Sequence, residues 1–267
     1  MPGRFAGQVA IVTAGGSGIG AATARRFAGE GAAVVVADLS GTRAEAVASE
    51  IKTGGGRAAA IKMDAANEDA VQRTLRLALD TFGRIDVMIN NAGLAEPAPL
   101  HEISLESWNR VIAVTLTSVF LGMKHCLPIM RALRRGAIVN TASISGICGD
   151  YGLSSYNAAK AGVINLTRAA AIENAPLNIR INCVCPGFID TRATQILGGD
   201  RADELRRHYA AAHPIGRVGE AGEIASTVLF LASDEASFIT GAAVVADGGL
   251  TAHTGLPHFQ RPDGRSR

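Results

Sequence analysis

The sequence has little cysteine, no concentrated positive charge and no long run of apolar residues. Its four cysteines form neither a Cys-x-x-Cys pair nor a cysteine–histidine spacing typical of metal ligands, so we expect buried free thiols and no metal site. The net charge is +2 without a lysine or arginine block, which argues against a nucleic-acid partner. No apolar run approaches the roughly eighteen residues of a membrane span, and the N-terminal apolar stretch is too short for a signal peptide. These absences predict a cytoplasmic protein with no membrane partner.

What the chain does contain is a regular alternation of apolar, β-rich runs with helical patterns. The helical patterns include residues 18–31, 43–56 and 67–83, and the last of them starts at a capping Asn67. The apolar runs are residues 8–14, 32–38, 57–63, 85–90, 136–142, 178–186 and 242–248. They are continuously apolar, which is typical of strands that are buried on both faces of a parallel sheet. We therefore predict an α/β fold: one doubly wound Rossmann-type domain over residues 1–250, with a mostly parallel seven-stranded sheet flanked by helices and an irregular tail over 251–267.

A glycine-rich loop joins the first predicted strand to the first helix, in the stretch "VTAGGSGIG" of residues 12–20. Glycines there let the backbone turn tightly and approach a pyrophosphate, which the helix N-terminus can bind through its amides. The second predicted strand ends in Asp38, eighteen residues after Gly20. A carboxylate at that offset can accept hydrogen bonds from the adenosine ribose and repels a 2′-phosphate. This pattern predicts a dinucleotide site that takes NAD rather than NADP.

Tyr156 and Lys160 stand four residues apart in a helical pattern, in a chain with three tyrosines and only four lysines. Residues at this spacing share a helix face. A free phenol has a pKa of about 10, and a nearby cation lowers that pKa, so we expect Lys160 to make Tyr156 a usable base. Ser143 ends the preceding strand and is placed to orient a substrate carbonyl. The three residues predict proton transfer at an oxygen.

These motifs resemble those of the short-chain dehydrogenase/reductase family, in the form usually called classical, from about residue 5 to residue 250. The stretches that carry the resemblance are "TAGGSGIG" (13–20), "NNAG" (90–93), "YNAAK" (156–160) after Ser143, "CPGFIDT" (185–191) and "GAAVVADGG" (241–249). The resemblance implies hydride transfer between a nicotinamide cofactor and a secondary alcohol or ketone. It also implies that Tyr156 is the general acid/base, that Ser143 stabilises the substrate oxygen and that Lys160 binds the nicotinamide ribose.

By the same resemblance, Asp64 contacts the adenine and Asn91 lies beneath the adenine ribose. The implied cofactor-binding residues are Thr13, Gly15, Ser17, Gly18, Ile19, Gly20, Asp38, Leu39, Asp64, Ala65, Asn91, Ala92, Gly93, Tyr156, Lys160, Pro186, Gly187, Ile189 and Thr191. The expected substrate contacts are Ser143, Ser145, Tyr151 and Tyr156. We expect residues 188–216 to form a lid with Gly198 and Gly199 as flexible points, and helices in 104–134 and 155–174 to pack in a homotetramer.

Two residues depart from the family pattern. Ala14 replaces the first glycine of the loop motif, and we expect an ordinary φ and a minor effect there. Thr115 stands where the family usually has an asparagine that holds a water in a proton relay to the lysine, so we count Thr115 among the catalytic candidates.

Two other functions stay open. One is an NADPH-dependent 3-oxoacyl-[acyl-carrier-protein] reductase, which shares the fold and the three catalytic residues. Ser17, Leu39 and Ser40 occupy the places where that class usually has a basic residue, and the nearest cation, Arg43, is expected inside the next helix, away from Asp38. The other is a non-catalytic NAD-binding regulatory module, which an intact Ser143–Tyr156–Lys160 set argues against.

Overall fold

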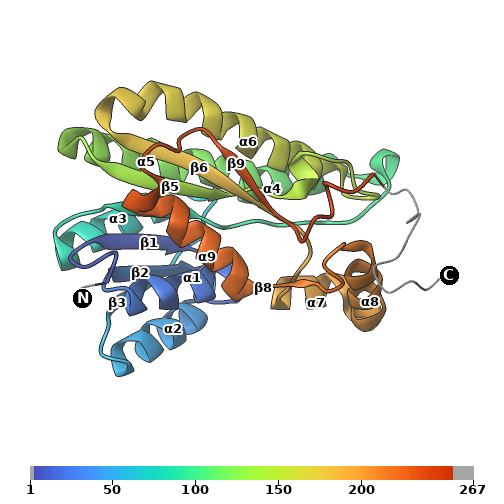
Figure 1. Cartoon of the computed structure of the whole chain (residues 1–267), viewed down its shortest axis with the longest axis horizontal. Helices are drawn as coiled ribbons and strands as arrows, with labels where there is room; N and C mark the ends of the chain where they lie inside the picture. Colours follow the sequence, from blue (N-terminus) through green and yellow to red (C-terminus); the bar gives the residue numbers. More distant parts are fainter. Residues whose placement is uncertain (1–2, 255–267) are drawn as a thin grey trace, which may run out of the picture.

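The structure, a computed structural model, describes residues 3–254; the predicted tail over 251–267 therefore lies almost entirely outside the described residues. Seven strands form one sheet in the order β3-β2-β1-β4-β5-β6-β9, and every neighbouring pair is parallel (Figure 1). The strands are β1 (Val9–Thr13), β2 (Ala33–Asp38), β3 (Arg57–Lys62), β4 (Val87–Asn90), β5 (Gly136–Thr141), β6 (Ile179–Pro186) and β9 (Ala243–Ala246). Each of them falls within a predicted run, so the predicted α/β class with a seven-stranded sheet is confirmed.

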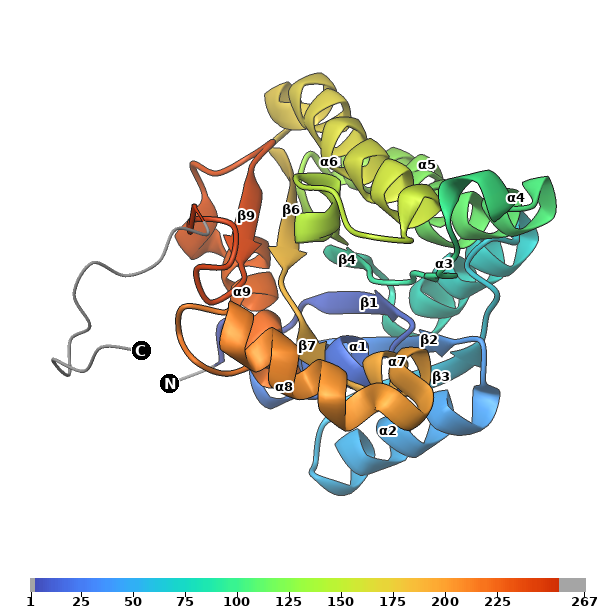
Figure 2. The same ribbon diagram turned by 90° about the vertical axis from the view of Figure 1, so that its right-hand side faces the viewer.

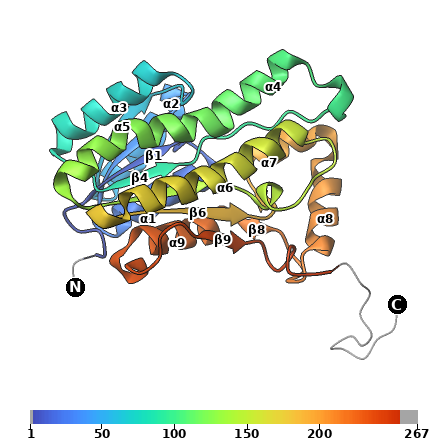
Figure 3. The ribbon, with the colours of Figure 1, turned by 90° about the horizontal axis from the view of Figure 1, so that it is seen from above.

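Helices cover both faces of the sheet, because successive strand residues point to opposite sides. Val9 and Ile11 of β1 belong to one apolar core, and Ala10 and Val12 belong to the other. The first core packs against α3 (Glu68–Phe82), α5 (Ser118–Leu133) and α6 (Ser154–Asn174). The second packs against α1 (Gly18–Gly29), α2 (Gly41–Thr53) and α9 (Ala221–Ala232). Figures 1 and 3 show these two helical layers with the sheet between them.

The two outer strands of the sheet are more exposed than their sequences predict. The inner strands β1, β2, β4 and β5 are buried along their whole length. Both ends of β3 are exposed, and Val245 in β9 is 42% exposed. Burial on both faces is therefore confirmed for the inner strands and is wrong for β3 and β9, because an edge strand has a neighbour on one side only.

One helical segment is more apolar than the sequence analysis recognised. The helix α4 (Leu105–Ile112), a π-helical turn over Ala113–Thr117 and α5 run continuously from Leu105 to Leu133, and an 18-residue window within this stretch has a mean hydropathy of 1.5. By length and composition this stretch could cross a membrane, so the statement that no segment approaches a span is wrong. Here the segment is a core helix: Val119, Met123 and Met130 are buried in the core against the sheet.

A separate pair of helices lies beyond the carboxyl ends of the strands. These are α7 (Arg192–Gly198) and α8 (Ala202–Ala212), flanked by the short parallel strands β7 (Ile189–Asp190) and β8 (Gly219–Glu220), which were not predicted. Figure 2 shows α7 and α8 across this end of the molecule. Gly199 between them has a φ of 49°, a conformation that favours glycine. This is the segment that we expected to form a lid.

Short 3₁₀ turns complete the described elements, at Leu100–Glu102, Ile144–Gly146, Ala175–Leu177, Gly199–Arg201 and Asp234–Ala236.

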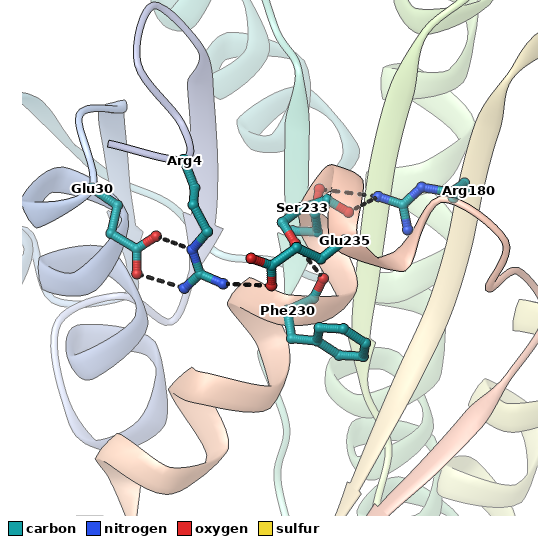
Figure 4. A network of polar contacts seen from close by, with 7 residues as sticks. Arg4, Glu30, Arg180, Phe230, Ser233 and Glu235 are labelled. Atoms are coloured by element: carbon teal, nitrogen blue, oxygen red, sulfur yellow. Dashed lines mark hydrogen bonds and ion pairs between the residues drawn. The ribbon is translucent and has the colours of Figure 1, made fainter. Parts of the chain in front are cut away.

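Charged side chains join the ends of the elements far from the lid (Figure 4). The half-buried Arg180 of β6 donates to the carbonyls of Leu231, Ala232 and Ser233 at 2.7, 3.1 and 2.9 Å. These carbonyls end α9 and have no partner within the helix, and a cation there also complements the helix dipole. Nearby, Arg4 binds Glu30 at 2.7 Å and Glu235 at 3.2 Å. Arg180 therefore holds α9 to the strand beside it.

We expect Arg180→Ala to lower the free energy of unfolding by about 2–3 kcal/mol, since it removes several charge-assisted hydrogen bonds to partly buried carbonyls. Urea denaturation measures the change. The matched control is Arg76→Ala, which removes an exposed arginine from α3 and should change stability by less than about 0.5 kcal/mol. Equal effects of the two substitutions would show that the cap on α9 contributes nothing.

Candidate active site

The glycine loop after β1 leaves no room for a side chain at Gly16 or Gly20. A Cβ on Gly20 would lie 2.1 Å from the Ala14 carbonyl oxygen and 2.7 Å from Asn91 Nδ2. A Cβ on Gly16 would lie 2.8 Å from the Asp38 carboxylate. Ser17 begins α1 with no side-chain cap, so its first amides stay available to an anion. The loop therefore fits the pyrophosphate of a dinucleotide.

The expectation of an ordinary φ at Ala14 is wrong. Its φ is 48°, in the left-handed region, because the chain must turn there so that the Gly15 amide can donate to the Ala37 carbonyl at 2.9 Å. Alanine in this region is strained by about 1 kcal/mol relative to glycine. The substitution therefore stores strain in the loop.

The carboxylate of Asp38 is buried beside this loop and is held by three donors. Its Oδ2 accepts from the Gly16 amide at 2.9 Å, and its Oδ1 accepts from the Ser40 amide and Arg43 Nη2, each at 2.9 Å. The expectation that no cation lies near Asp38 is wrong. Ser40 caps α2, and this brings Arg43, in the first turn of the helix, back over the end of β2. Arg43 Nε is buried and has no hydrogen-bond partner among the described residues.

The loops after β1 and β4 are tied to each other. Thr13 Oγ1 accepts from the Asn91 and Ala92 amides at 2.8 and 3.2 Å, and Asn91 Nδ2 donates to the Thr13 carbonyl at 3.2 Å. Thr141 Oγ1 of β5 donates to Asn91 Oδ1 at 3.2 Å. Thr13 and Asn91 thus brace three strands at the edge where the cofactor is expected.

Other predicted cofactor residues lie along the same edge. Gly93 lies close to Lys160, since its Cβ would be 3.5 Å from Lys160 Nζ, and Thr191 lies against Gly18, whose Cβ would be 3.3 Å from it. Leu39 and Asp64 are exposed at the ends of β2 and β3, Ile19 and Ala65 are half-buried, and Pro186, Gly187 and Ile189 lead from β6 into the lid.

Ser143, Tyr156 and Lys160 meet at the carboxyl end of β5. Tyr156 and Lys160 share a face of α6, where Lys160 Nζ lies 5.5 Å from the centroid of the tyrosine ring. Lys160 Nζ donates to the Thr141 carbonyl at 2.5 Å, and the Ser143 hydroxyl makes a hydrogen bond with the phenol. Ser145, a predicted substrate contact, receives a hydrogen bond from Ser143 Oγ at 3.1 Å and so positions that hydroxyl.

The electrostatics of this group differ from the expectation. Tyr156 is half-buried, and burial raises the pKa of its phenol to about 12; the hydrogen bond with Ser143 opposes this rise, and the charge of Asp150 adds to it. Burial also lowers the pKa of Lys160 to about 8. The expectation that Lys160 lowers the phenol pKa below 10 is wrong for this structure, because burial is the largest cause of the shift and raises the pKa.

Thr115 is fully buried in the π-helical turn and bonds to the loop after β4. Its hydroxyl accepts from the Leu94 amide at 3.0 Å and donates to the Leu94 carbonyl at 3.1 Å. The side chain therefore fixes the loop to the helix. Its part in a proton relay stays a prediction.

The sequence analysis did not single out three further residues, Asp150, Phe188 and Tyr209. Asp150 precedes the predicted substrate contact Tyr151, yet Tyr151 is fully exposed, whereas Asp150 Oδ2 is enclosed. Tyr209 of α8 stacks on Phe188 with the ring centroids 4.1 Å apart. No motif marks these positions.

Comparisons with known proteins show what this chain is similar to. A family model described as enoyl-(acyl carrier protein) reductase matches residues 13–251. Cis-4-hydroxycyclohexanecarboxylate dehydrogenase of Sinomonas cyclohexanicum is 49% identical, over 93% of this chain and 98% of that protein. Cyclohexanol dehydrogenase of Acinetobacter sp. (strain SE19) is 44% identical, over 94% of this chain and 98% of that protein. The crystal structure of levodione reductase superposes with a TM-score of 0.90 at 37% identity, over 93% of this chain and 99% of that one.

The lowered pKa of Lys160 predicts a pH-dependent effect on stability. Between pH 8 and 10.5 the unfolded chain binds a proton at this lysine and the folded chain does not, so stability rises with pH in this window and is lowest below pH 8. We therefore compare the free energy of unfolding of Lys160→Met with that of the native chain at each pH. The variant should gain about 3 kcal/mol more over the native chain at pH 7 than at pH 10.5.

Urea denaturation at the two pH values measures this difference. Tyr156 is present in both proteins, so its contribution to the pH dependence cancels when the two are compared. Lys52→Met, at an exposed lysine of α2, is the control and should show no such change. If the free energies of unfolding of the native chain and Lys160→Met differ by the same amount at pH 7 and at pH 10.5, the lowered pKa of Lys160 is contradicted.

Proposed function

The chain belongs to the classical short-chain dehydrogenase/reductase family, and from this membership we propose that it is an NAD(H)-dependent oxidoreductase that interconverts a secondary alcohol and a ketone. The observation that carries the proposal is the meeting of Ser143, Tyr156 and Lys160 beside the glycine loop, with Tyr156 hydrogen-bonded to Ser143. A binding module has no need of a buried lysine beneath a phenol, and this placement argues against a purely regulatory role.

In the proposed mechanism, the nicotinamide cofactor supplies or accepts the hydride when it is bound. The loop amides bind the pyrophosphate, Asp38 binds the adenosine ribose, and Thr191 orients the nicotinamide end. Ser143 donates to the substrate oxygen. Tyr156 gives that oxygen a proton during reduction and removes one during oxidation.

The protonation states set a direction preference. With a pKa of about 12, Tyr156 is a protonated acid at neutral pH, so it is ready to donate to a ketone oxygen. Oxidation requires the phenolate, so we propose that alcohol oxidation speeds up as pH rises above neutral. Lys160, with a pKa of about 8, holds its positive charge through neutral pH.

We propose small alicyclic or aliphatic secondary alcohols and the matching ketones as substrates. The names of the two relatives, a dehydrogenase of cis-4-hydroxycyclohexanecarboxylate and one of cyclohexanol, support this class. The stacked Phe188 and Tyr209 supply a flat wall at the lid on which such a ring can pack.

A 3-oxoacyl-[acyl-carrier-protein] reductase that uses NADPH stays the second candidate. The ion pair between Arg43 and Asp38 supports this second candidate, because Arg43 could pair with the 2′-phosphate of NADPH. The sequence analysis had placed Arg43 away from Asp38 and so gave this candidate less support. Against it, Asp38 already accepts from two backbone amides and is therefore placed as an acceptor for ribose hydroxyls.

We further propose a cytoplasmic homotetramer. The outer faces of α5 and α6 carry exposed apolar side chains, Phe120 at 45% and Ile172 at 76%, which association of identical chains would cover. The buried free thiols Cys126, Cys183 and Cys185 support a reducing compartment.

The direct test is oxidation of cyclohexanol and reduction of cyclohexanone, followed by nicotinamide absorbance, for the native chain and Tyr156→Phe. The variant loses only a hydroxyl, so it should fold and bind NADH, while kcat falls by about 10²–10⁴-fold. Near-native kcat in Tyr156→Phe would mean that another group moves the proton.

Arg43 should set how strongly the enzyme prefers NAD. It offsets part of the charge of Asp38, so we expect a preference for NAD in kcat/KM of about tenfold in the native chain and about a hundredfold in Arg43→Ala, because the carboxylate then repels the 2′-phosphate unscreened. Lys52→Ala, which removes an exposed cation from the same helix, should leave the ratio unchanged. A native preference for NADP, or a ratio that Arg43→Ala does not move, would refute the assignment of NAD.

A further inference from the structure

The segment that joins β4 to α4 has no regular secondary structure from residue 93 to residue 99. It reads "GLAEPAP", and the two prolines, Pro97 and Pro99, remove two of the amides that could hold it by backbone hydrogen bonds. The residue before a proline favours an extended backbone, which is the position of Glu96. This β4–α4 segment therefore depends on contacts with other elements for a fixed position.

Both halves of the β4–α4 segment lie against the surroundings of the catalytic residues. In the first half, Gly93 leaves room for Lys160, because a Cβ on Gly93 would lie 3.5 Å from Lys160 Nζ. In the second half, the Ala98 amide donates to the Gly152 carbonyl at 2.9 Å. Gly152 stands four residues before Tyr156, at the entry to α6. A shift of this segment therefore disturbs both the lysine and the start of the catalytic helix.

Glu96, in the middle of the segment, ties it to α4. Its carboxylate accepts from Arg110 Nε and Nη2, each at 2.7 Å, and from the Ser107 hydroxyl at 2.6 Å. Ser107 and Arg110 stand three residues apart and so share a face of α4. The hydrogen bonds with Arg110 and Ser107 lower the pKa of the Glu96 carboxyl. An exposed ion pair usually contributes little to stability, but a two-point contact between arginine and carboxylate fixes geometry.

A second anchor of the segment lies at Leu94. Its amide and its carbonyl both bond to Thr115 Oγ1, in the π-helical turn that follows α4 directly. Thr115 therefore holds the half of the segment that contains Gly93. The half that contains Ala98 is held to the same helical frame by Glu96.

We propose that Glu96 is a positioning residue for the reaction, which keeps the β4–α4 segment in the place where Lys160 and Tyr156 have their catalytic geometry. It acts through Ala98 and Gly152 rather than by contact with the reacting atoms. Without this contact the segment can shift, and a misplacement of about 1 Å can lower a rate by about a hundredfold. The inference rests on the proposed function and adds a residue that lies outside the motifs of the family.

The test measures kcat and KM of Glu96→Ala with the secondary alcohol and the cofactor that the native chain uses best. We expect kcat per mole of folded enzyme to fall by about ten- to a hundredfold, because the catalytic groups are misplaced. The KM for the cofactor should rise by no more than about threefold, since the glycine loop and Asp38 are placed to hold its adenosine half. Thermal denaturation gives the folded fraction.

Three further variants separate geometry from charge and from folding. Glu96→Gln keeps one acceptor for Arg110, so its kcat should lie between those of the native chain and Glu96→Ala. Arg110→Lys keeps the charge but offers no two-point contact, so it should lower kcat as well. Glu106→Ala is the matched control: it removes an exposed carboxylate that lies 3.5 Å from the same arginine, and it should leave kcat unchanged. If Glu96→Ala does not fold, Glu96→Gln and Arg110→Lys provide the same test.

Hydrogen exchange gives a readout that needs no turnover. The Ala98 amide should exchange faster in Glu96→Ala than in the native chain, because its hydrogen bond to Gly152 then opens more often. In Glu106→Ala it should exchange as in the native chain.

The outcomes are distinct. Native kcat in folded Glu96→Ala overturns the inference and leaves the proposed function standing, even if the Ala98 amide exchanges faster. A fall in kcat without faster exchange also overturns it, because Glu96 then acts by another route, and so does an equal fall in Glu106→Ala. A native chain that turns over no secondary alcohol with either cofactor overturns the proposed function itself, and the inference with it.

Discussion

The site depends on the parallel pairing of β1 with both of its neighbours. Val9–Thr13 pairs with Ala33–Ala37 on one side, and its centre pairs with Val87–Ile89 on the other. The chain leaves β1 in one direction and returns to β4 from the other, so the loops after these two strands diverge and open a crevice at the carboxyl edge. Thr13 Oγ1 holds the two sides of this crevice at a fixed separation through the amides of Asn91 and Ala92.

Within that crevice, burial and charge oppose each other. Desolvation disfavours the phenolate of Tyr156 and the ammonium of Lys160 alike. It therefore raises the pKa of the phenol and lowers the pKa of the lysine. The Thr141 carbonyl and the Ser143 hydroxyl offset part of this by direct hydrogen bonds. Such a pair is unfavourable for stability and useful for chemistry, which is the usual compromise at catalytic sites.

Two of the expectations that failed, at Arg43 and Ala14, share a cause. Arg43 is five residues from Asp38 in the sequence and was placed away from it, but the cap at Ser40 starts α2 at once and turns the first helical residues back over the strand end. Ala14 was expected to have an ordinary φ, but the bond from Gly15 to Ala37 across two strands forces the left-handed conformation. In both cases a hydrogen bond between separate elements overrode the local pattern.

The sequence by itself determined the seven strands of the main sheet, the helices between them, the glycine loop and the spacing of Tyr156 and Lys160, because apolar periodicity and glycine positions act through neighbours in the chain. The tertiary structure decided everything that depends on distance between elements. It paired Arg43 with Asp38 and hydrogen-bonded Thr115 to the Leu94 backbone. It also set the direction of the pKa shifts, because desolvation is the sum of all surrounding atoms, and no short stretch of sequence contains that sum.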